Sequence, residues 1–318
     1  MTKEVVHVAA AAIVNDFNEV LISQRAHDAH QGSLWEFPGG KIEHGESVHQ
    51  ALLRELHEEI DIHVDSCRPL IKVKHEYADK TVLLDVWKVN SFTGKITGKE
   101  GQAIRWQAVD QLSHSEFPAA DVPVIRALNL PESYLITGKF DSIHDFEQRF
   151  GTAIDNGIRL AQLRLTHDWL QENNKKTASQ IINLAINLCR QSGVRLLFNI
   201  PEEISTEITS SSLHLNSHKL SQYTSRPDCD ALCVSCHTKE DLIEAQHLGA
   251  DFMVLSPVQA TATHPDVIPL GWDKFSEMIA EINVPVYALG GVSPGDLEKA
   301  WLAGAQGISA IGALWNLP

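Results

Sequence analysis

The stretch GGKIEHGESVHQALLRELHEEIDI, residues 39–62, decides the fold of the first part of the chain. Ser47 and Gln50 have the spacing of a capping box, which predicts a helix that begins at Val48 and leaves Glu46 just outside it. Apolar residues recur at helical spacing, namely Leu52, Leu53, Leu56 and Ile60. One face of the predicted helix therefore packs on a hydrophobic core.

Three carboxylates share a neighbouring face of this helix. Glu55, Glu58 and Glu59 stand at positions i, i+3 and i+4. Clustered carboxylates repel one another unless a cation is present, and their hard oxygen atoms suit Mg²⁺ or Mn²⁺. A solvated acidic face is the ordinary explanation of such a run, but it leaves the PGG loop at 38–40 and Arg54 unexplained. We therefore expect a metal site.

Length and composition predict two globular domains. The chain has 318 residues, of which 43% are hydrophobic and 21% are charged. No run of about 18 apolar residues predicts a membrane span. The first residues, MTKEVVHV, lack the pattern of a signal peptide, so we expect a cytoplasmic protein.

The formal net charge of −15 disfavours nucleic acid as a partner, because no cluster of Lys and Arg offsets it. A small phosphorylated substrate fits if a divalent cation neutralises part of the charge. The five cysteines are an odd number without secretory context, which disfavours disulfides. Cys233 to His237 matches the C-x-x-C-H pattern of haem attachment, but ALCVS at 231–235 is typical of a buried strand. We expect structural cysteines.

The predicted elements change in rhythm near residue 130. The first part predicts strands at 5–14, 19–24, 71–75, 81–89 and 105–108, a loop through PGG, and a last helix at 122–128, which is a mixed α/β pattern. NLPES at 129–133 is typical of a linker. We expect domains at 1–130 and 134–318, joined by a linker at 131–133.

The second part predicts a compact (β/α)8 barrel. Eight short apolar runs alternate with helical stretches, beginning at residues 134, 159, 194, 213, 231, 252, 284 and 307. An open doubly wound sheet is the alternative, although it usually has fewer strands at this length.

Residues 40–62 resemble the Nudix box, G-x5-E-x7-R-E-U-x-E-E-x-G-U, except that Asp61 replaces a glycine. The likeness extends from about Val6 to Leu130 and is closest to MutT-type enzymes, which implies an α/β/α sandwich with a mixed sheet. It implies metal binding by the Gly39 carbonyl, Glu55, Glu58, Glu59 and Glu100, with Arg54 orienting the glutamates and Glu46 supporting them. The base could be Glu55, Glu58 or Glu100.

The implied activity is Mg²⁺-dependent hydrolysis of oxidised purine nucleoside triphosphates, such as 8-oxo-dGTP, to the monophosphate and pyrophosphate. This is nucleotide-pool sanitation. The resemblance places Arg25, Phe37, Asp79, Lys80 and Asp121 at the nucleotide pocket, with Lys80 replacing an arginine and Asp121 replacing an asparagine. An 8-oxoguanine edge offers an acceptor, O6, beside a donor, N7–H, which a carboxamide satisfies. Asp121 would have to be protonated, at a raised pKa, to do the same.

The second part resembles thiamine phosphate synthases and thiazole tautomerases through QLRL at 162, CVSCHTKEDL at 233, GADFMVLSPV at 249 and PVYALGGVSP at 285. A pocket for a phosphorylated thiazole or pyrimidine is implied at Gln162, Arg164, Ser235, His237, Gly290, Gly291 and Ser309. The synthase pattern is broken at Thr166, Ile200, 216–219 and His264. The barrel is then a degenerate binding or structural domain, a tautomerase using His237, or a synthase using other groups.

Two other functions fit the whole chain. The first domain could hydrolyse pyrophosphorylated thiamine intermediates or analogues while the barrel handles a related compound. Alternatively, the chain could be a non-enzymatic sensor of nucleotide or thiazole phosphate, although the intact glutamates argue against it.

Overall fold

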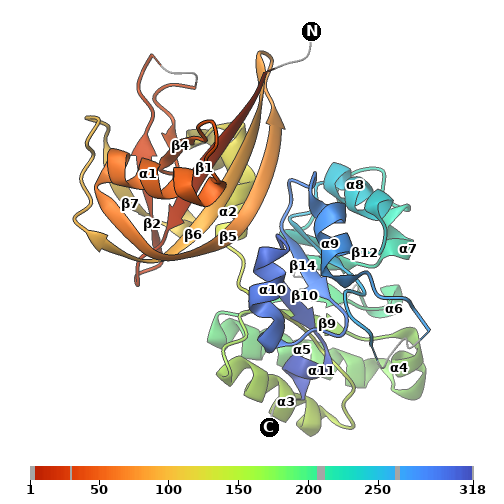
Figure 1. Ribbon diagram of the computed structural model, residues 1–318. Helices are drawn as coiled ribbons and strands as arrows, with labels where there is room; N and C mark the ends of the chain where they lie inside the picture. The colour runs from red at the N-terminus through yellow and green to blue at the C-terminus, as the bar shows by residue number, and fades with distance from the viewer. Residues whose placement is uncertain (1–3, 29–30, 206–211, 262–265, 317–318) are drawn as a thin grey trace. The chain divides into compact units, whose positions relative to one another are not determined.

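The computed structural model describes residues 4–28, 31–205, 212–261 and 266–316. The chain divides into two compact units, with the break between Leu130 and Pro131 (Figure 1). No helix in these described ranges is long and apolar enough to cross a membrane.

The first unit contains two sheets. Its strands are β1 (Glu4–Ile13), β2 (Glu19–Gln24), β3 (Trp35–Glu36), β4 (Gly39–Lys41), β5 (Ile62–Glu76), β6 (Lys80–Gly94) and β7 (Ile104–Ala108). One sheet has the order β4-β1-β6-β5 and is mixed, because β1 runs parallel to β6 and antiparallel to β4. The other has the order β3-β2-β7. The expected PGG loop is only partly a loop, because both of its glycines pair with β1.

Helices cover both faces of the mixed sheet, as expected for an α/β/α sandwich. They are α1 (Val48–Ile60) and α2 (Val122–Leu128), and α2 follows three short 3-10 turns at 109–111, 114–116 and 119–121. Successive residues of a strand point to opposite faces. Ala9 and Ala11 of β1 accordingly join the core beneath α1, while Ala10 and Ala12 join the core that contains α2.

Helix α1 begins at Val48, as its capping box predicts. Ser47 Oγ accepts from the Gln50 backbone N–H at 3.2 Å, and Gln50 Oε1 accepts from the Ser47 N–H at 2.9 Å. Asp61 takes the left-handed conformation, φ 63° and ψ 37°, that a glycine would adopt more easily. The Lys99 ammonium lies 2.5 Å from Asp61 Oδ1 and holds the pKa of that carboxyl below its usual value.

The second unit is a closed barrel of eight parallel strands in the order β10-β11-β12-β13-β14-β15-β8-β9. They are β8 (Ser133–Ile136), β9 (Leu160–Arg164), β10 (Arg195–Asn199), β11 (Ser212–Leu215), β12 (Ala231–Cys236), β13 (Phe252–Leu255), β14 (Val286–Leu289) and β15 (Gly307–Ala310). Closure excludes the open doubly wound sheet. Strand β8 begins one residue before the expected start of the barrel domain.

The helices of the barrel follow its strands in the alternating manner expected. They are α3 (Ile143–Asp155), α4 (His167–Glu172), α5 (Lys175–Ser192), α6 (Glu202–Ser205), α7 (Ser217–Leu220), α8 (Lys239–Leu248), α9 (Gly271–Ile279), α10 (Leu297–Leu302) and α11 (Gly312–Trp315). A short 3-10 turn at 294–296 precedes α10.

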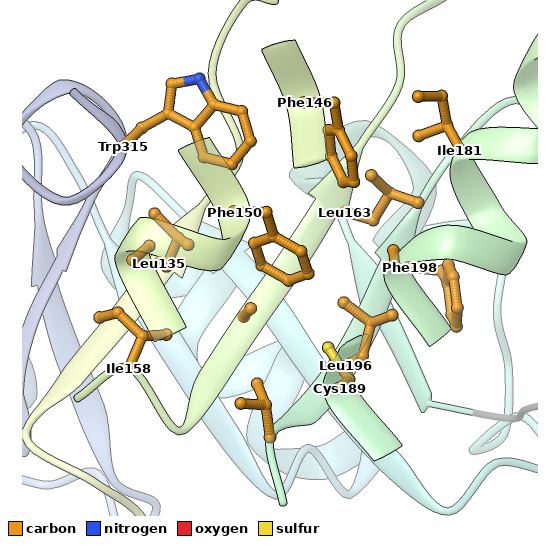
Figure 2. Packing of buried hydrophobic residues seen from close by; sticks show 14 of the residues in the cluster. Leu135, Phe146, Phe150, Ile158, Leu163, Ile181, Cys189, Leu196, Phe198 and Trp315 are labelled. Atoms are coloured by element: carbon orange, nitrogen blue, oxygen red, sulfur yellow. The ribbon is translucent and has the colours of Figure 1, made fainter. Parts of the chain in front are cut away.

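Strand residues alternate between an outer and an inner core. Figure 2 shows part of the outer core, where Phe146 and Phe150 of α3 pack near Leu135 of β8 and Leu163 of β9. Tyr134, the neighbour of Leu135, points inward instead. It lies with His214, Phe252 and Tyr287 in an aromatic layer inside the barrel. This layer lies beneath the carboxyl ends of the strands, where barrel sites are built.

Candidate functional site

Arg54 connects three of the glutamates around α1. Its Nε and Nη2 donate to the two oxygens of Glu46 at 2.8 and 2.9 Å. Its Nη1 donates to Glu55 at 2.8 Å and to Glu58 at 3.2 Å. These bonds lower the pKa of Glu46 to about 2, because the guanidinium stabilises the ionised carboxyl. Arg54 thereby holds neighbouring carboxylates at fixed positions.

The two glycines of β4 bring the chain close to those carboxylates. A Cβ atom on Gly40 would lie 2.3 Å from the carboxyl carbon of Glu55. Gly39 has φ of +147° and donates its N–H to Glu59 Oε2 at 2.8 Å, while a Cβ there would lie 2.2 Å from the Ala9 carbonyl oxygen. Side chains larger than hydrogen would therefore displace the carboxylates or the strand.

Glu59 differs from the other glutamates because it is half-buried and its carboxylate accepts from the Gly39 N–H. Burial raises its pKa, the Gly39 N–H opposes that rise, and the nearby charge of Glu100 adds to it. Gln102 links the two segments, since its amide donates to the Glu59 carbonyl at 3.1 Å and accepts from the Glu100 N–H at 3.0 Å. No local pattern pointed to Gln102, because only the fold brings it to α1.

A second group of residues forms an aromatic cluster. The rings of Phe37 and Phe117 stack with centroids 5.7 Å apart, and both side chains are buried. Tyr77 Oη accepts from the Ala120 N–H at 3.4 Å. Tyr77 lies at the β5–β6 turn with Asp79 and Lys80, so it ties that turn to the segment before Asp121. Neither Phe117 nor Tyr77 was predicted from the sequence.

Asp121 is buried, with 6% of its surface exposed. Burial raises its pKa to about 8, and the carboxyl of Glu36 adds to the rise while Arg25 opposes it. Glu36 forms an ion pair with Arg25, yet burial still raises the pKa of Glu36 to about 7. Glu36 was not predicted, because its position between Trp35 and Phe37 is typical of the polar face of a strand.

The barrel contains a cavity of about 940 Å³. Every residue predicted for the barrel site contributes to its wall, namely Gln162, Arg164, Ser235, His237, Gly290, Gly291 and Ser309. Gly290 and Gly291 take left-handed φ values of 94° and 70°, and a Cβ on Gly291 would lie 2.5 Å from the Ala260 carbonyl oxygen. This backbone close approach requires glycine.

Comparison with known proteins identifies both units. Residues 9–127 match the NUDIX domain family, and residues 133–314 match the thiamine monophosphate synthase family. The 8-oxo-dGTP diphosphatase of Escherichia coli strain K12 is 41% identical over 121 residues, which are 38% of this chain and 94% of that protein. The chain belongs to both families.

Other relatives resemble one unit each. The CTP pyrophosphohydrolase of Escherichia coli strain K12 is 34% identical over 124 residues, covering 39% of this chain and 91% of that protein. The thiamine-phosphate synthase of Synechococcus sp. strain CC9605 is 27% identical over 188 residues, covering 57% of this chain and 50% of that protein. The first unit is a Nudix pyrophosphohydrolase domain, and the second is a synthase-like barrel.

The donor set of the Nudix domain fits a hard divalent cation. Glu46, Glu55, Glu58 and Glu59 set four carboxylates against the single guanidinium of Arg54, and Mg²⁺ or Mn²⁺ relieves such an excess of negative charge. Within the described ranges, no three His, Cys, Asp or Glu side chains form a ready-made metal cluster. Cys233 and Cys236 of the barrel are buried free thiols, as structural cysteines would be.

The cavity of the synthase-like barrel carries a positive charge at Arg164. Its described wall includes Arg164, His218 and His237 but no Asp or Glu. His237 Nδ1 lies 2.9 Å from the Ser256 carbonyl oxygen, which can only accept, so Nδ1 carries the hydrogen and the neutral ring has its lone pair on Nε2. The ring is therefore held in one tautomer.

The expected departures from the synthase pattern lie in different surroundings. Thr166 caps α4, because its hydroxyl accepts from the Trp169 N–H at 3.1 Å. Ile200 packs on the outer core of the barrel. Asn216 caps α7 by accepting from the Lys219 N–H at 2.9 Å, and it also contributes to the cavity wall. His264 lies outside the described residues.

Proposed function

We propose that the Nudix domain hydrolyses oxidised purine nucleoside triphosphates, such as 8-oxo-dGTP, to the monophosphate and pyrophosphate. The observation that carries this proposal is the burial of Asp121, which raises the pKa of its carboxyl to about 8 and so favours the protonated acid at neutral pH. Its acid O–H can donate to O6 of 8-oxoguanine while its carbonyl oxygen accepts from N7–H. The neutral acid thus offers the same donor and acceptor as the family's asparagine.

The metal-binding group would be the Gly39 carbonyl with Glu55, Glu58, Glu59 and Glu100. Bound Mg²⁺ or Mn²⁺ supplies charge neutralisation of the triphosphate and activation of a water for attack on the β-phosphorus. Arg54 orients Glu55 and Glu58 through charge-assisted hydrogen bonds. Gly40 leaves room for the Glu55 carboxylate.

The side chains around Asp121 would set its protonation and hold the base. Glu36 keeps the pKa of Asp121 raised, and Arg25 limits that rise. The resemblance places Phe37 at the base, and the Phe117 ring would support it from behind by stacking. Asp79 and Lys80, at the turn tied down by Tyr77, would contact the nucleotide outside the base pocket.

A substrate panel with Mg²⁺ tests this proposal. The full chain is assayed with 8-oxo-dGTP, dGTP, CTP and pyrophosphorylated hydroxymethylpyrimidine, and the released phosphate and pyrophosphate are measured separately. We expect the highest kcat/KM for 8-oxo-dGTP, with pyrophosphate as the product. A preference for the pyrimidine pyrophosphate would support thiamine-related hydrolysis instead, and turnover of none would support the sensor.

The pH dependence of selectivity tests the role of Asp121 in particular. Above about pH 8 the acid ionises and loses its donor, so the preference for 8-oxo-dGTP over dGTP should fall in the wild type. The Asp121→Asn variant keeps its donor at every pH and should keep its preference. Parallel profiles for the two proteins would contradict the proposed recognition.

We propose that the barrel is a degenerate synthase that binds a phosphorylated thiazole or pyrimidine. The guanidinium of Arg164 in the cavity wall supports phosphate binding, with Gly290, Gly291 and Ser309 near the carboxyl ends of β14 and β15. The absence of carboxylates from its described wall removes the ligands that a Mg²⁺-pyrophosphate complex needs. A tautomerase remains the second candidate, because the Ser256 carbonyl fixes His237 with a free Nε2 lone pair.

Calorimetry of the full chain with thiazole phosphate tests the barrel. Binding without turnover is the expected result, and conversion of the thiazole tautomer that is lost in His237→Asn would favour the tautomerase. Formation of thiamine phosphate from the thiazole and pyrimidine substrates would refute degeneracy. Absence of binding would refute the proposed ligand.

A further inference from the structure

The segment between β6 and β7 is fastened to the end of α1. It comprises residues 95–103, which we call the β6–β7 connection. The last four carbonyl groups of a helix have no partner inside the helix. In α1, the Ile60 carbonyl accepts from the Thr97 N–H at 3.0 Å, and the Glu59 carbonyl accepts from the Lys99 N–H at 2.9 Å. The connection therefore caps the helix that carries the clustered glutamates.

Gln102 adds three hydrogen bonds to this junction. Its Nε2 donates to the Glu59 carbonyl at 3.1 Å and to Glu59 Oε1 at 3.4 Å. Its Oε1 accepts from the Glu100 N–H at 3.0 Å. The Glu59 carbonyl can only accept and the Glu100 N–H can only donate, so the side-chain amide has one orientation. A single side chain thus joins Glu59 to the backbone of Glu100.

Gly98 lets the connection close over Gln102. A Cβ atom on Gly98 would lie 2.7 Å from the Gln102 carbonyl oxygen and 3.1 Å from its Oε1. The first distance is too short for a contact between a Cβ atom and a backbone oxygen, so a side chain at 98 would push Gln102 away. Glycine allows this close approach because it has no Cβ.

Electrostatic repulsion would drive Glu100 away from this place. Burial raises the pKa of Glu59, and the nearby charge of Glu100 adds to that rise, so the two carboxyls lie within electrostatic reach of each other. The C-terminus of a helix also carries a partial negative charge, which disfavours an anion beside it. Before a cation binds, the position of Glu100 therefore depends on the anchors that hold its segment.

Lys99 is a second anchor, and it is the weaker of the two. Its ammonium lies 2.5 Å from Asp61 Oδ1 and donates to the His57 carbonyl at 3.4 Å. The side chains of Lys99 and Asp61 are 39% and 44% exposed, and ion pairs in solvent contribute little. Gln102 is half-buried, where water competes less for its hydrogen bonds. We therefore expect Gln102 to contribute more.

We propose that Gln102 is a positioning residue that holds Glu100 beside Glu59 before a metal ion arrives, with Lys99 as a secondary anchor. This inference rests on the proposed function, in which Glu59 and Glu100 bind Mg²⁺ or Mn²⁺. The metal then meets ligands that are already in place, so its binding does not have to order the connection. Substitution of Gln102 should weaken metal binding, although Gln102 is outside the proposed metal-binding group.

Hydrogen exchange of the metal-free full chain tests the anchoring without any ligand. Exchange is measured by mass spectrometry for peptides that cover the β6–β7 connection. Gln102→Leu nearly keeps the volume of the side chain and removes its amide, so the connection should exchange at least about 10-fold faster than in the wild type. Lys99→Met should increase the rate about 2-fold. An unchanged rate in Gln102→Leu would overturn the anchoring role.

Binding of Mn²⁺ alone tests whether Gln102 acts through Glu100. Free Mn²⁺ is followed by electron paramagnetic resonance in titrations of the wild type, Gln102→Leu, Glu100→Gln and the double variant. Gln102→Leu should weaken Mn²⁺ binding about 10-fold, as the loss of a residue that orients a ligand does. In the Glu100→Gln background its effect should be at most about 2-fold, because the Gly39 N–H still holds the Glu59 carboxylate. Equal losses in both backgrounds would overturn a role through Glu100.

Gln111→Leu is the matched control, because Gln111 is an exposed glutamine of the same unit whose Oε1 accepts from Gln107 Nε2 at 3.5 Å. It should exchange and bind Mn²⁺ as the wild type does, and thermal unfolding checks that every variant folds. Gly98→Ala should reproduce the result of Gln102→Leu. Unchanged Mn²⁺ binding in Glu100→Gln would refute the proposed metal ligand instead, while exchange of the metal-free chain would still decide whether Gln102 holds the connection.

Discussion

Replacing Asp121 by Asn should remove a large pH dependence from the stability of the Nudix domain. In the unfolded chain the carboxyl titrates near 3.8, whereas in the folded domain burial raises its pKa to about 8. Between these values the folded state keeps a proton that the unfolded state releases. The free energy of unfolding therefore falls as pH rises from about 4 to about 8, and Asn lacks this term.

The size of the effect follows from the difference between the two pKa values. The difference is about 4 units, 8 minus 3.8, and each unit corresponds to about 1.36 kcal/mol, which gives an upper limit of roughly 6 kcal/mol. Local opening that hydrates the carboxyl reduces the loss. When the pH rises from 4.5 to 8, we expect the free energy of unfolding of Asp121→Asn to increase by at least about 2 kcal/mol relative to that of the wild type.

Hydrogen exchange followed by mass spectrometry can report this difference in the full chain, since peptides from β1 and β6 follow the Nudix domain separately. Rates are corrected for the intrinsic pH dependence of exchange and converted to opening free energies. Asp110→Asn is the control, because Asp110 is an exposed carboxylate of the same unit. If wild type, Asp110→Asn and Asp121→Asn changed in parallel with pH, Asp121 would not be protonated in the folded domain.

Three further changes test the carboxylate site. Glu55→Gln should lower kcat for 8-oxo-dGTP at least about 10²-fold, and retained turnover in steady-state assays would show that its charge is dispensable. Gly40→Ala should cause a loss of similar size, because the new Cβ would lie 2.3 Å from the Glu55 carboxyl carbon and misplacement by 1 Å can cost about 10² in rate; an unchanged kcat would contradict the observed packing. Ser47→Ala should destabilise α1 by about 1 kcal/mol, measured by exchange of the α1 amides, with Ser113→Ala as a control whose hydroxyl makes no cap hydrogen bond.

The features that the sequence predicted are those fixed by short-range spacing. Helix α1 and its capping box follow from residues a few positions apart, and so does the grouping of Glu55 with Glu58. The eight barrel strands follow from repeated apolar runs. Because parallel strands need crossover connections, the helical stretches between the runs predict parallel strands. Eight such strands agree with the closed barrel.

The missed residues are those that reach a site only through tertiary contacts. Glu36 resembles a surface strand position until β3 folds beside Arg25. Gln102 and Tyr77 are ordinary loop and strand residues whose side chains bridge distant segments. The hydrogen bonds of His214 to Tyr134 and Ser235 were not predicted, because these partners are separated from it by 80 and 21 residues in the sequence. Its neutral state depends on burial, which local patterns do not reveal.

The aspartate at the end of α1 limits how this sequence can change over time. Thr97 and Lys99 donate their backbone N–H groups to the carbonyls of Ile60 and Glu59 at 3.0 and 2.9 Å. The Asp61–Lys99 ion pair fastens the same loop, which continues into Glu100. A glycine at 61 would relax the backbone but would remove the carboxylate that pairs with Lys99, one anchor of that loop. Substitutions at 61 and 99 should thus be epistatic, each acceptable or harmful according to the other.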